Sequence, residues 1–438
     1  MCSHQGDPPI CSLRKAAMSK IAIIGSGISG LSAAYLLSRK HDVVLFEREA
    51  RIGGHSRTIT VRQGDRIIPV DTGFIVFNER NYPNLTALFR ELSVPVKDSD
   101  MTYAMSVGNG RFEWGAQNLN TIFAQRSNLI NPSFYGLFRE VMRFNGDAER
   151  TVEKSPEISL GDLIASMGLS ERFRQLYLLP MSGAIWSSPP RQMMEFPASV
   201  FVQFFRNHGL LSMSGQPQWR TVDGGSEQYV SRIVKALGDR VRTSCEVNSV
   251  RREQGEVIVR NAAGEVHTFD HVVLACHSDE ALSVLADGTS AEIAALSAIR
   301  YQKNDAILHR DPRFMPRRRR CWASWNYQSD GKGNEPAVAV TYWMNRLQGI
   351  DEAFPLFVTL NPSSEVAARD VYDRHVFHHP VFDAGAIVAQ STLRQLQGQS
   401  NTWYCGAYMR HGFHEDGLVS ALHVVDRLGC RPDWAKLD

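Results

Sequence analysis

The stretch Ile21-Ala22-Ile23-Ile24-Gly25-Ser26-Gly27-Ile28-Ser29-Gly30 decides the fold that we expect for this chain. Its four leading apolar residues are typical of a buried parallel strand, and its glycines follow the spacing G-x-G-x-x-G. In such a turn Gly25 allows the tight bend, Gly27 lets backbone approach a pyrophosphate, and Gly30 lets a helix pack closely on the strand. Apolar residues at helical spacing follow, so a helix N-terminus would offer free N–H groups to phosphates.

The next strand completes this unit. Residues 42–46 are Asp-Val-Val-Leu-Phe, and Glu47 follows them directly. A carboxylate about 20 residues beyond the glycines can accept hydrogen bonds from an adenosine ribose. Strand, glycine turn, helix, strand and acid together predict a dinucleotide-binding unit in an α/β fold. The alternative is a glycine-rich turn in an ordinary α/β protein.

The residues after this strand indicate which dinucleotide is bound. Residues 47–55 read E-R-E-A-R-I-G-G-H, with the spacing E-x-x-x-R-x-G-G. This segment resembles the extended fingerprint of the flavin amine oxidase superfamily, which includes monoamine oxidases, protoporphyrinogen oxidase and carotenoid desaturases. The resemblance implies FAD as cofactor, with Gly53 and Gly54 bringing backbone against its pyrophosphate. Where the superfamily commonly has arginine this chain has His55, which neutralises a phosphate less well but can donate a hydrogen bond. The alternative is an ordinary loop histidine.

Composition narrows the class of protein. The 438 residues can form two or three domains, and 43% hydrophobic with 21% charged residues is ordinary for a soluble globular protein. A net charge of +2 is too small to indicate nucleic-acid binding. The seven cysteines are scattered without a C-x-x-C pair, which favours a reducing compartment and argues against a cysteine zinc site. We therefore expect a cytoplasmic protein without a metal site.

The chain also shows an expected order of domains. Residues 1–17 lack the apolar core of a signal peptide and are predicted to be disordered, with Met18 as a candidate start. The resemblance implies an α/β fold of the amine oxidase and glutathione reductase type. A Rossmann-like FAD-binding domain would comprise residues 18–77, 216–290 and 386–438. An inserted α+β substrate domain would comprise residues 78–215 and 291–385.

The inserted segments carry helical and strand-like patterns. Apolar residues at helical spacing dominate residues 85–213, which predicts helices. The resemblance implies that their Phe and Met side chains line a hydrophobic substrate tunnel. The alternative is a plain helical core. Residues 338–344 are strand-like and aromatic, and Trp322, Trp325 and Tyr327 lie on a comparable segment. We expect both segments in one sheet that roofs a pocket.

An arginine run stands out within this second insertion. Residues 313–321 read R-F-M-P-R-R-R-R-C, with four consecutive arginines close to Phe314 and Met315. Basic side chains beside apolar ones are suited to an anionic membrane surface, where each contributes about 1 kcal/mol. The segment thus predicts peripheral membrane contact, with a solvated loop as the alternative.

The C-terminal part returns to the cofactor in the resembled superfamily. There a strand ending in glycine, here Gly406, precedes a glycine-containing loop, here residues 411–417, and a helix whose N-terminus faces the flavin N1/O2 edge. A helix N-terminus stabilises the negative charge that hydride uptake leaves at that edge. At Glu415 we expect the backbone, not the carboxylate, to face the ring. The resemblance implies cofactor contacts at Gly25, Ser26, Gly27, Ile28, Ser29, Gly30, Glu47, Arg48, Gly53, Gly54, His55, Thr72, Gly73, Phe74, Val247, Gly406, His414, Glu415 and Leu418.

The sequence does not identify a catalytic residue as clearly as it identifies the cofactor contacts. Cys276 and His277 form a tempting nucleophile–base pair, but adjacent residues of a strand point to opposite faces, so we favour a structural role. His411 and His414 are candidates for moving protons near the ring edge.

The landmarks together resemble one branch of the superfamily, from about residue 18 to 432. That branch is the bacterial predicted NAD/FAD-binding proteins associated with cyclopropane fatty acid synthases. It implies an FAD-dependent oxidoreductase that passes a hydride from a lipid or fatty acyl group to flavin N5, in desaturation-type chemistry, with a lipid methyltransferase as a partner. The alternatives are a flavin amine oxidase acting on a small amine, an isomerase using reduced flavin, and a non-catalytic FAD-binding partner of a lipid methyltransferase.

Overall fold

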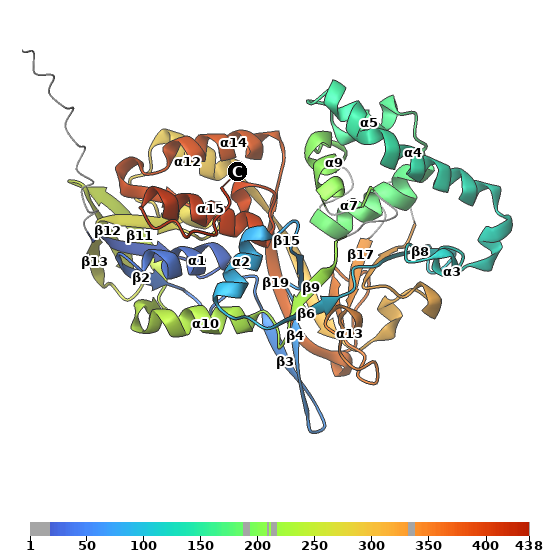
Figure 1. Cartoon of the computed structure of the whole chain (residues 1–438), viewed down its shortest axis with the longest axis horizontal. Helices are drawn as coiled ribbons and strands as arrows, with labels where there is room; N and C mark the ends of the chain where they lie inside the picture. Colours follow the sequence, from blue (N-terminus) through green and yellow to red (C-terminus); the bar gives the residue numbers. More distant parts are fainter. Residues whose placement is uncertain (1–17, 187–192, 208–209, 212–216, 332–337, 438) are drawn as a thin grey trace, which may run out of the picture.

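The computed structural model describes residues 18–186, 193–207, 210–211, 217–331 and 338–437. Figure 1 shows one part that holds α1, α10, α12, α14 and α15, and a second part that holds α4, α5, α7 and α9. Strands β15, β17 and β19 lie between these two parts. The predicted disorder of residues 1–17 lies outside the described residues.

A five-stranded parallel sheet forms the centre of the first part. Its strand order is β10-β2-β1-β14-β20, and each neighbouring pair is parallel. Strand β1 is central and residues 21–24 are buried, which confirms the buried parallel strand predicted from the sequence. The strands are β1 (Lys20–Ile24), β2 (Asp42–Phe46), β10 (Val241–Arg242), β14 (His271–Leu274) and β20 (Thr402–Tyr404).

The two faces of β1 pack against different layers. Because side chains alternate along a strand, Ile21 and Ile23 face a core shared with α1, α10 and α15. Ala22 and Ile24 face a second core formed with a three-stranded meander and the helices α11, α12 and α14. These elements are α1 (Ile28–Leu37), α10 (Glu227–Leu237), α15 (His414–Arg427), β11 (Val247–Glu253), β12 (Glu256–Asn261), β13 (Val266–Phe269), α11 (Ser278–Val284), α12 (Ser290–Ala298) and α14 (Ala384–Leu396).

Helix α12 begins at Ser290 and packs beside α14 in this core, so it crosses the domain boundary expected between residues 290 and 291. The division of the chain into the two expected domains stays a prediction. Short 3-10 turns border this part, at Gly238–Arg240, Gln399–Asn401 and Ala407–Met409.

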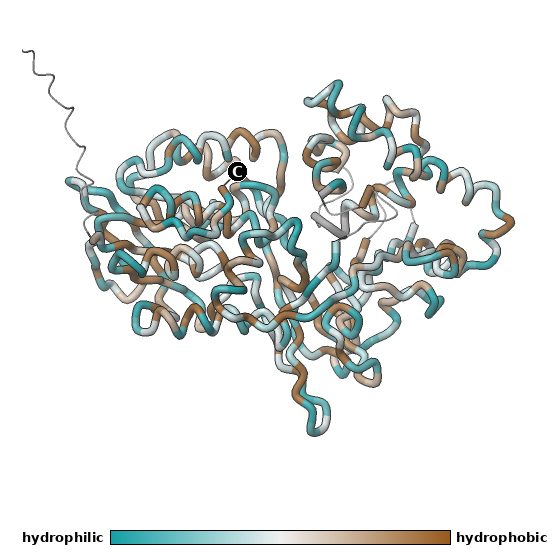
Figure 2. Tube along the Cα trace, viewed as in Figure 1, coloured by the Kyte–Doolittle hydropathy of each residue, from teal (hydrophilic) through white to brown (hydrophobic). Residues whose placement is uncertain are grey.

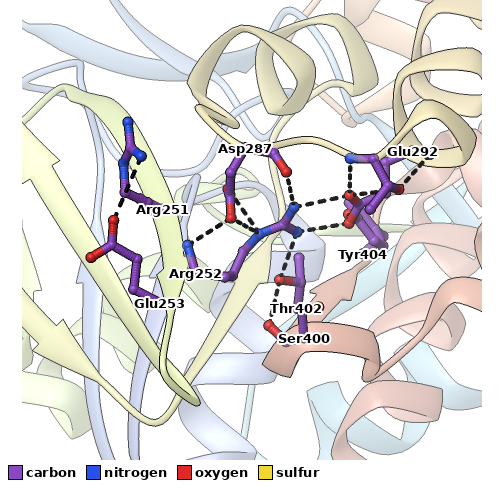
Figure 3. Close-up of polar contacts among 9 residues, drawn as sticks. Arg251, Arg252, Glu253, Asp287, Glu292, Ser400, Thr402 and Tyr404 are labelled. Carbon is purple, nitrogen blue, oxygen red and sulfur yellow. Dashed lines mark hydrogen bonds and ion pairs between the residues drawn. The ribbon is translucent and has the colours of Figure 1, made fainter.

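A buried ion cluster fastens the meander to α12 and β20 (Figure 3). The Arg252 guanidinium donates to Asp287 at 3.0 Å from Nε, and to both Glu292 oxygens at 2.7 and 2.9 Å. Nη1 of Arg252 also donates to Thr402 Oγ1 at 3.2 Å, and Tyr404 OH donates to Glu292 at 2.5 Å. The side chains of Arg252 and Glu292 are only 6% and 5% exposed. The cluster therefore joins three segments that are distant in the sequence.

Two smaller sheets connect the parts. Strands β3 (Thr58–Gln63) and β4 (Arg66–Asp71) form an antiparallel hairpin that turns at residues 64–65. Strand β9 (Trp219–Val222) pairs with both β5 (Val76–Asn78) and β6 (Val96–Ser99), and α2 (Pro83–Glu91) lies between β5 and β6 in the chain.

A seven-stranded sheet spans the two insertions, in the order β19-β15-β18-β17-β16-β7-β8. Trp325 of β16 pairs with Tyr342 of β17, which confirms that the two aromatic segments share one sheet. The strands are β7 (Tyr103–Val107), β8 (Phe112–Gly115), β15 (Arg300–His309), β16 (Trp325–Ser329), β17 (Val338–Trp343), β18 (Phe357–Leu360) and β19 (Val371–Val381), with α13 (Met344–Leu347) and 3-10 turns at Pro312–Phe314, Arg319–Cys321 and Ala368–Asp370.

The first insertion is largely helical, as predicted. In its described part, Phe144, Phe173, Phe201 and Phe205 are fully buried and pack together, so these aromatics form helical core. Part of the segment expected to line a tunnel, including Met213, lies outside the described residues. The elements are α3 (Leu119–Ile122), a 3-10 turn (Arg126–Ile130), α4 (Pro132–Lys154), α5 (Leu160–Ser166), α6 (Glu171–Phe173), a π-helical turn (Arg174–Leu178), α7 (Leu179–Trp186) and α9 (Ala198–Asn207).

No helix of the described ranges is both long and apolar enough to cross a membrane.

Candidate active site

The glycine turn after β1 is packed at two glycines and open at the third. Gly25 has φ +101°, and a Cβ added there would lie 3.0 Å from the Ala275 backbone. A Cβ on Gly30 would lie 1.9 Å from the Gly25 carbonyl oxygen, so helix and turn are in direct contact. A Cβ on Gly27 would meet nothing within 4 Å. Gly27 therefore borders open space at the place where the sequence predicts a pyrophosphate.

Helix α1 begins next to this open space. Its N-cap residue is Gly27, which has no side chain to accept from the first N–H groups of the helix. Those N–H groups and the helix dipole favour an anion at this end. The structure thus fits a phosphate group at the position that the sequence predicts.

Glu47 is held over the same turn. One carboxylate oxygen accepts from Ser26 N at 3.0 Å and from Ser26 Oγ at 2.5 Å, and the other accepts from Glu49 N at 2.9 Å. Arg48 points away to the rim, where it pairs with Glu280 of α11 at 2.8 Å. The carboxylate lies at the turn, while the ribose contact itself stays a prediction, as does any role of Arg48.

The segment around residues 53–55 lies against the glycine turn. Gly53 N donates to Ser26 O at 3.1 Å, and a Cβ on Gly54 would sit 3.0 Å from Gly27 Cα. Both glycines have positive φ, +118° and +55°, which side chains rarely adopt. The two backbone segments are therefore in direct contact, beside the open side of Gly27 where the pyrophosphate is predicted.

Residues 72–74 run beside His55. Phe74 N donates to His55 O at 2.8 Å, and Thr72 N donates to Arg57 O at 2.9 Å. A Cβ on Gly73 would lie 2.1 Å from His55 O, so only glycine fits this crossing. Thr72, Gly73 and Phe74, which the resemblance implies as cofactor contacts at the D-x-G segment of residues 71–73, thus join the same cradle.

The C-terminal helix closes the third side. Ser29 Oγ donates to Gly417 O at 2.8 Å, and a Cβ on Gly417 would lie 2.8 Å from Ile28 Cγ2, so α15 packs directly on α1. Gly406 is tied to α15 because its N–H donates to Ser420 Oγ at 2.9 Å. Leu418 is fully buried in this contact. Three segments that are far apart in the sequence therefore converge on one place. Val247 is buried at the start of β11, on the other side of β2.

The Glu415 carboxylate is engaged elsewhere. It accepts from Asn84 N at 2.9 Å, Asn84 Nδ2 at 2.8 Å and Leu85 N at 2.8 Å, at the N-terminus of α2. It therefore neutralises the free N–H groups of that helix. A backbone contact of Glu415 with the cofactor stays a prediction.

His414 lies in a polar and aromatic nest. Its ring stacks on Phe74 at 3.9 Å between centroids, and Nε2 lies 2.9 Å from Ser56 Oγ and 3.1 Å from Tyr229 OH. Burial lowers the pKa of His414 to about 3. A histidine that is neutral over the ordinary pH range can hold a hydrogen-bonded position, but it is a poor proton carrier.

A second group of histidines adjoins His55. The His55 ring lies 6.1 Å from that of His277, 5.3 Å from that of His379 and 4.9 Å from that of Phe377. Burial lowers the pKa of each of these histidines, to about 4 for His379. These imidazoles line the cradle as neutral groups that each offer one donor and one acceptor.

Cys276 and His277 do not act as a pair. Burial raises the pKa of the Cys276 thiol, which disfavours the nucleophilic thiolate. The His277 ring stacks on Tyr301 at 4.4 Å. Both observations agree with the structural role expected for these residues, which stays a prediction. Across the described residues, no three His, Cys, Asp or Glu side chains gather as metal ligands would.

Sequence reasoning missed several residues of this site. Asp71 accepts from Thr58 Oγ1 at 2.6 Å, Ser226 N at 2.9 Å and Gln348 Nε2 at 3.1 Å, and burial raises its pKa to about 6. It ties the hairpin, the turn before α10 and α13 together. Its signal was present in the sequence, because Asp71 begins the D-x-G segment.

His375, Phe377 and His379 also had a signal in the sequence, the period of two that places them on one face of β19. Ser56 and Tyr229 had none.

Comparisons with known proteins agree with this geometry. The family model described as "Flavin containing amine oxidoreductase" matches residues 28–311, which is more than half of the chain. The "Amine oxidase [flavin-containing] A" of Sus scrofa is 26% identical over 59% of this chain and 49% of its own length. The "Putative flavin-containing monoamine oxidase AofH" of Mycobacterium tuberculosis is 24% identical over 56% of this chain and 54% of its own length. The chain thus spans about half the length of the curated relatives it matches.

Solved structures of the same fold cover nearly the whole chain. A putrescine oxidase variant covers 95% of this chain and all of its own, with a TM-score of 0.70 and 13% identity. The CLA-producing fatty acid isomerase from P. acnes covers 93% of this chain and 98% of its own, with a TM-score of 0.68 and 14% identity. A putative protoporphyrinogen oxidase from Exiguobacterium sp. 255-15 has a TM-score of 0.68 and 15% identity over 94% of this chain and 99% of its own. At such identities the likeness shows the fold alone.

Proposed function

Because this chain belongs to the flavin containing amine oxidoreductase family, we propose that it is an FAD-dependent oxidoreductase that oxidises a lipid or fatty acyl group. The FAD-dependent activity is supported by one observation above all. Helix α1, residues 53–55 and α15 converge around the open side of Gly27. FAD, when bound there, supplies the acceptor for a hydride from the substrate.

The chain's own residues bind and orient this cofactor. The N-terminus of α1 and the backbone at Gly27 and Gly54 hold the pyrophosphate without a bulky side chain. Glu47 is placed to accept from the ribose, since the oxygen that accepts from Glu49 N keeps a free lone pair, while the other oxygen already accepts two bonds from Ser26. The N-terminus of α15 favours negative charge at the third side of the cradle. The stacked rings of half-buried His414 and Phe74 form an aromatic wall beside it.

An exposed apolar tip supports a lipid substrate. Ile130 is 86% exposed and Leu119 is 73% exposed, and Leu129 and Tyr135 are exposed beside them. Figure 2 shows this hydrophobic segment at the far end of the helical part, between α3 and α4. Residues 117–139 contain Arg126 and Arg139 but no Asp or Glu. A basic apolar tip of this kind is suited to an anionic lipid surface.

The arginine run adjoins this tip, because the turn Arg319–Cys321 packs against α3. The arginines are anchored within the fold. Arg318 Nη1 donates to the buried Glu113 at 2.7 Å, and Arg319 lies 3.8 Å from the Trp322 ring centroid and pairs with Glu352. In the proposed membrane contact, the arginines of residues 313–321 would therefore face lipid headgroups while the apolar side chains of the tip enter the lipid.

We expect the variant Ile130→Asp to bind phosphatidylserine-containing vesicles at least about tenfold more weakly than the parent protein. Placing one large apolar side chain in the membrane contributes about 1.5–3 kcal/mol, and an aspartate would also repel the anionic lipid. Vesicle sedimentation measures the binding. The matched control is Val388→Asp on α14, a change at an apolar residue that is 66% exposed far from the tip. Equal binding of parent and Ile130→Asp would contradict the membrane contact.

The oxidase activity is tested by bleaching of the flavin. Purified protein is expected to be yellow, and its flavin absorbance should bleach without oxygen when acyl lipid is added, because the flavin accepts the hydride. Mass spectrometry of membrane lipids with and without the gene should then show a two-hydrogen difference in an acyl chain. Colourless protein that also takes up no FAD would defeat the flavoenzyme proposal. Yellow protein that bleaches with neither lipid nor amine would defeat the oxidase and leave an isomerase that needs reduced flavin or a non-catalytic FAD-binding role.

A flavin amine oxidase is the second candidate. The curated relatives are named amine oxidases, and the site holds neutral histidines beside the aromatic Phe74 and Phe377. Bleaching by a small amine such as benzylamine, with release of ammonia, would favour this candidate over lipid oxidation. A lipid methyltransferase as partner stays a prediction, which co-purification would test.

A further inference from the structure

Nine residues line a cavity of about 440 Å³ between α14, α15 and strand β20. Cavities of this size are typical of small-molecule sites. Three of the lining residues are arginines, Arg394, Arg410 and Arg427, and none of the nine is acidic. The lining is completed by Gln397, Trp403, Met409, Ser420, His423 and Val424.

The neutral polar groups of the lining are already engaged. Gln397 Nε2 donates to Tyr404 O at 2.6 Å, and its Oε1 accepts from Tyr404 N at 2.9 Å. Ser420 Oγ accepts from Gly406 N at 2.9 Å and donates to Gly417 O at 2.7 Å. The Gln397 amide therefore satisfies the backbone of β20, and the Ser420 hydroxyl ties Gly406 to α15. The guanidinium groups and His423 remain as the polar groups that face a ligand.

The guanidinium groups keep most of their donors. Arg394 Nη2 donates to Met409 O at 3.1 Å and Arg427 Nη1 donates to Gln397 O at 3.4 Å, out of five N–H donors in each side chain. Neither arginine pairs with a carboxylate of the described residues, and Arg410 lies 3.7 Å from Asp416. The pKa of His423 is lowered by burial and then by these three arginines. Positive charge is thus concentrated at one place without an equal number of acids.

The rest of the lining is apolar. Trp403, Met409 and Val424 are each more than nine-tenths buried. The Trp403 indole N–H is also buried and has no hydrogen-bond partner in the described structure. Because this N–H is closed to solvent, Trp403 presents apolar ring atoms to the pocket rather than a hydrogen-bond donor.

We propose that this pocket binds a small amphiphilic anion, in which a phosphate or carboxylate group contacts Arg394 and Arg427 and an apolar body covers Trp403, Met409 and Val424. Guanidinium groups bind both of these anions through paired hydrogen bonds. The proposal does not depend on the proposed oxidase activity, because the pocket lies on the outer side of α15 and its ligand need not react.

Isothermal titration of the FAD-containing full chain with dodecyl phosphate, laurate and inorganic phosphate tests the proposal. We expect the two amphiphiles to bind, and inorganic phosphate to bind at least tenfold more weakly. The double variant Arg394→Gln/Arg427→Gln should weaken amphiphile binding at least tenfold, since it removes two charge-assisted contacts. Its control is Arg150→Gln on α4, which removes one arginine charge from an exposed site outside the pocket and should leave amphiphile binding unchanged. Dodecyl phosphate binding more tightly than laurate would identify a phosphate ester, and the reverse order a carboxylate.

Three results would overturn the proposal. The first is that neither amphiphile binds at about 1 mM, a concentration that detects even weak sites. The second is that the parent protein and the double variant bind the amphiphiles equally. The third is that inorganic phosphate binds as tightly as the amphiphiles. Far-UV circular dichroism of both variants checks that they fold, which the exposed positions of Arg394 and Arg427 favour. A second variant, Val424→Phe, fills the apolar side and should weaken dodecyl phosphate binding while the arginines remain.

Discussion

The variant Gly27→Val is expected to fold normally and to contain no flavin. A Cβ at this position meets nothing within 4 Å, and the backbone at Gly27 has φ −68° and ψ −177°, which valine adopts readily. The added side chain would instead occupy the space where backbone must approach the pyrophosphate. We expect FAD affinity to fall by about a thousandfold, or roughly 4 kcal/mol. Absorbance of the purified protein and titration with FAD measure the loss.

Two further variants separate cofactor binding from folding. Gly136→Ala, on α4, also adds a Cβ into open space and should stay yellow and stable. Gly30→Ala would place a Cβ 1.9 Å from the Gly25 carbonyl oxygen, so it should damage the fold itself. If Gly27→Val retained its flavin, the open side of the glycine turn would not be the pyrophosphate site. Loss of folding in Gly27→Val would show that the open space is needed by the chain itself.

The sequence predicted those parts of the fold in which local pattern and local structure coincide. The strand from Lys20, the turn at Gly25 and the start of α1 follow one another directly, so hydrophobic period and glycine spacing suffice. The hairpin of β3 and β4 and the pairing of β16 with β17 also follow from nearby alternation and aromatic content. The partition into two domains has no such local signal at residue 290, where α12 continues across the expected boundary.

The candidate site was only partly accessible from sequence, because its side chains meet through long-range packing. The glycine positions were identified by spacing, yet the contact of His55 with His379 depends on how β19 packs against the cradle. The same holds for His414, whose neighbours Ser56 and Tyr229 come from different elements. The Glu415 carboxylate illustrates the physical reason. The sequence indicates only that this carboxylate does not face the ring, and it is the packing of α15 on α2 that brings it to the free N–H groups at Asn84 and Leu85.

Removing the Arg252 guanidinium is expected to be the most destabilising change outside the cofactor cradle. In Arg252→Met the Glu292 carboxylate would stay buried without its partner, which typically costs about 3–5 kcal/mol. Asp287 and Thr402 would lose hydrogen bonds as well. Because Thr402 and Tyr404 belong to the strand that leads to Gly406, flavin binding should also weaken. Urea unfolding monitored by circular dichroism measures the loss, and FAD titration its effect on the cofactor.

The matched control and the pH dependence test whether charge burial is the cause. Arg150→Met breaks an ion pair whose partners are 72% and 42% exposed, so it should cost less than about 1 kcal/mol. The double variant Arg252→Met/Glu292→Gln should recover part of the loss, since no unpaired charge stays buried. The Arg252 and Tyr404 contacts hold the pKa of Glu292 at about 2, below its ordinary 4.5. A lowered folded-state pKa stabilises the protein above pH 4.5, and this stability is lost as the pH falls through 2. Glu292→Gln should lack that part of the acid dependence, and an unchanged dependence would assign the acid sensitivity to other groups.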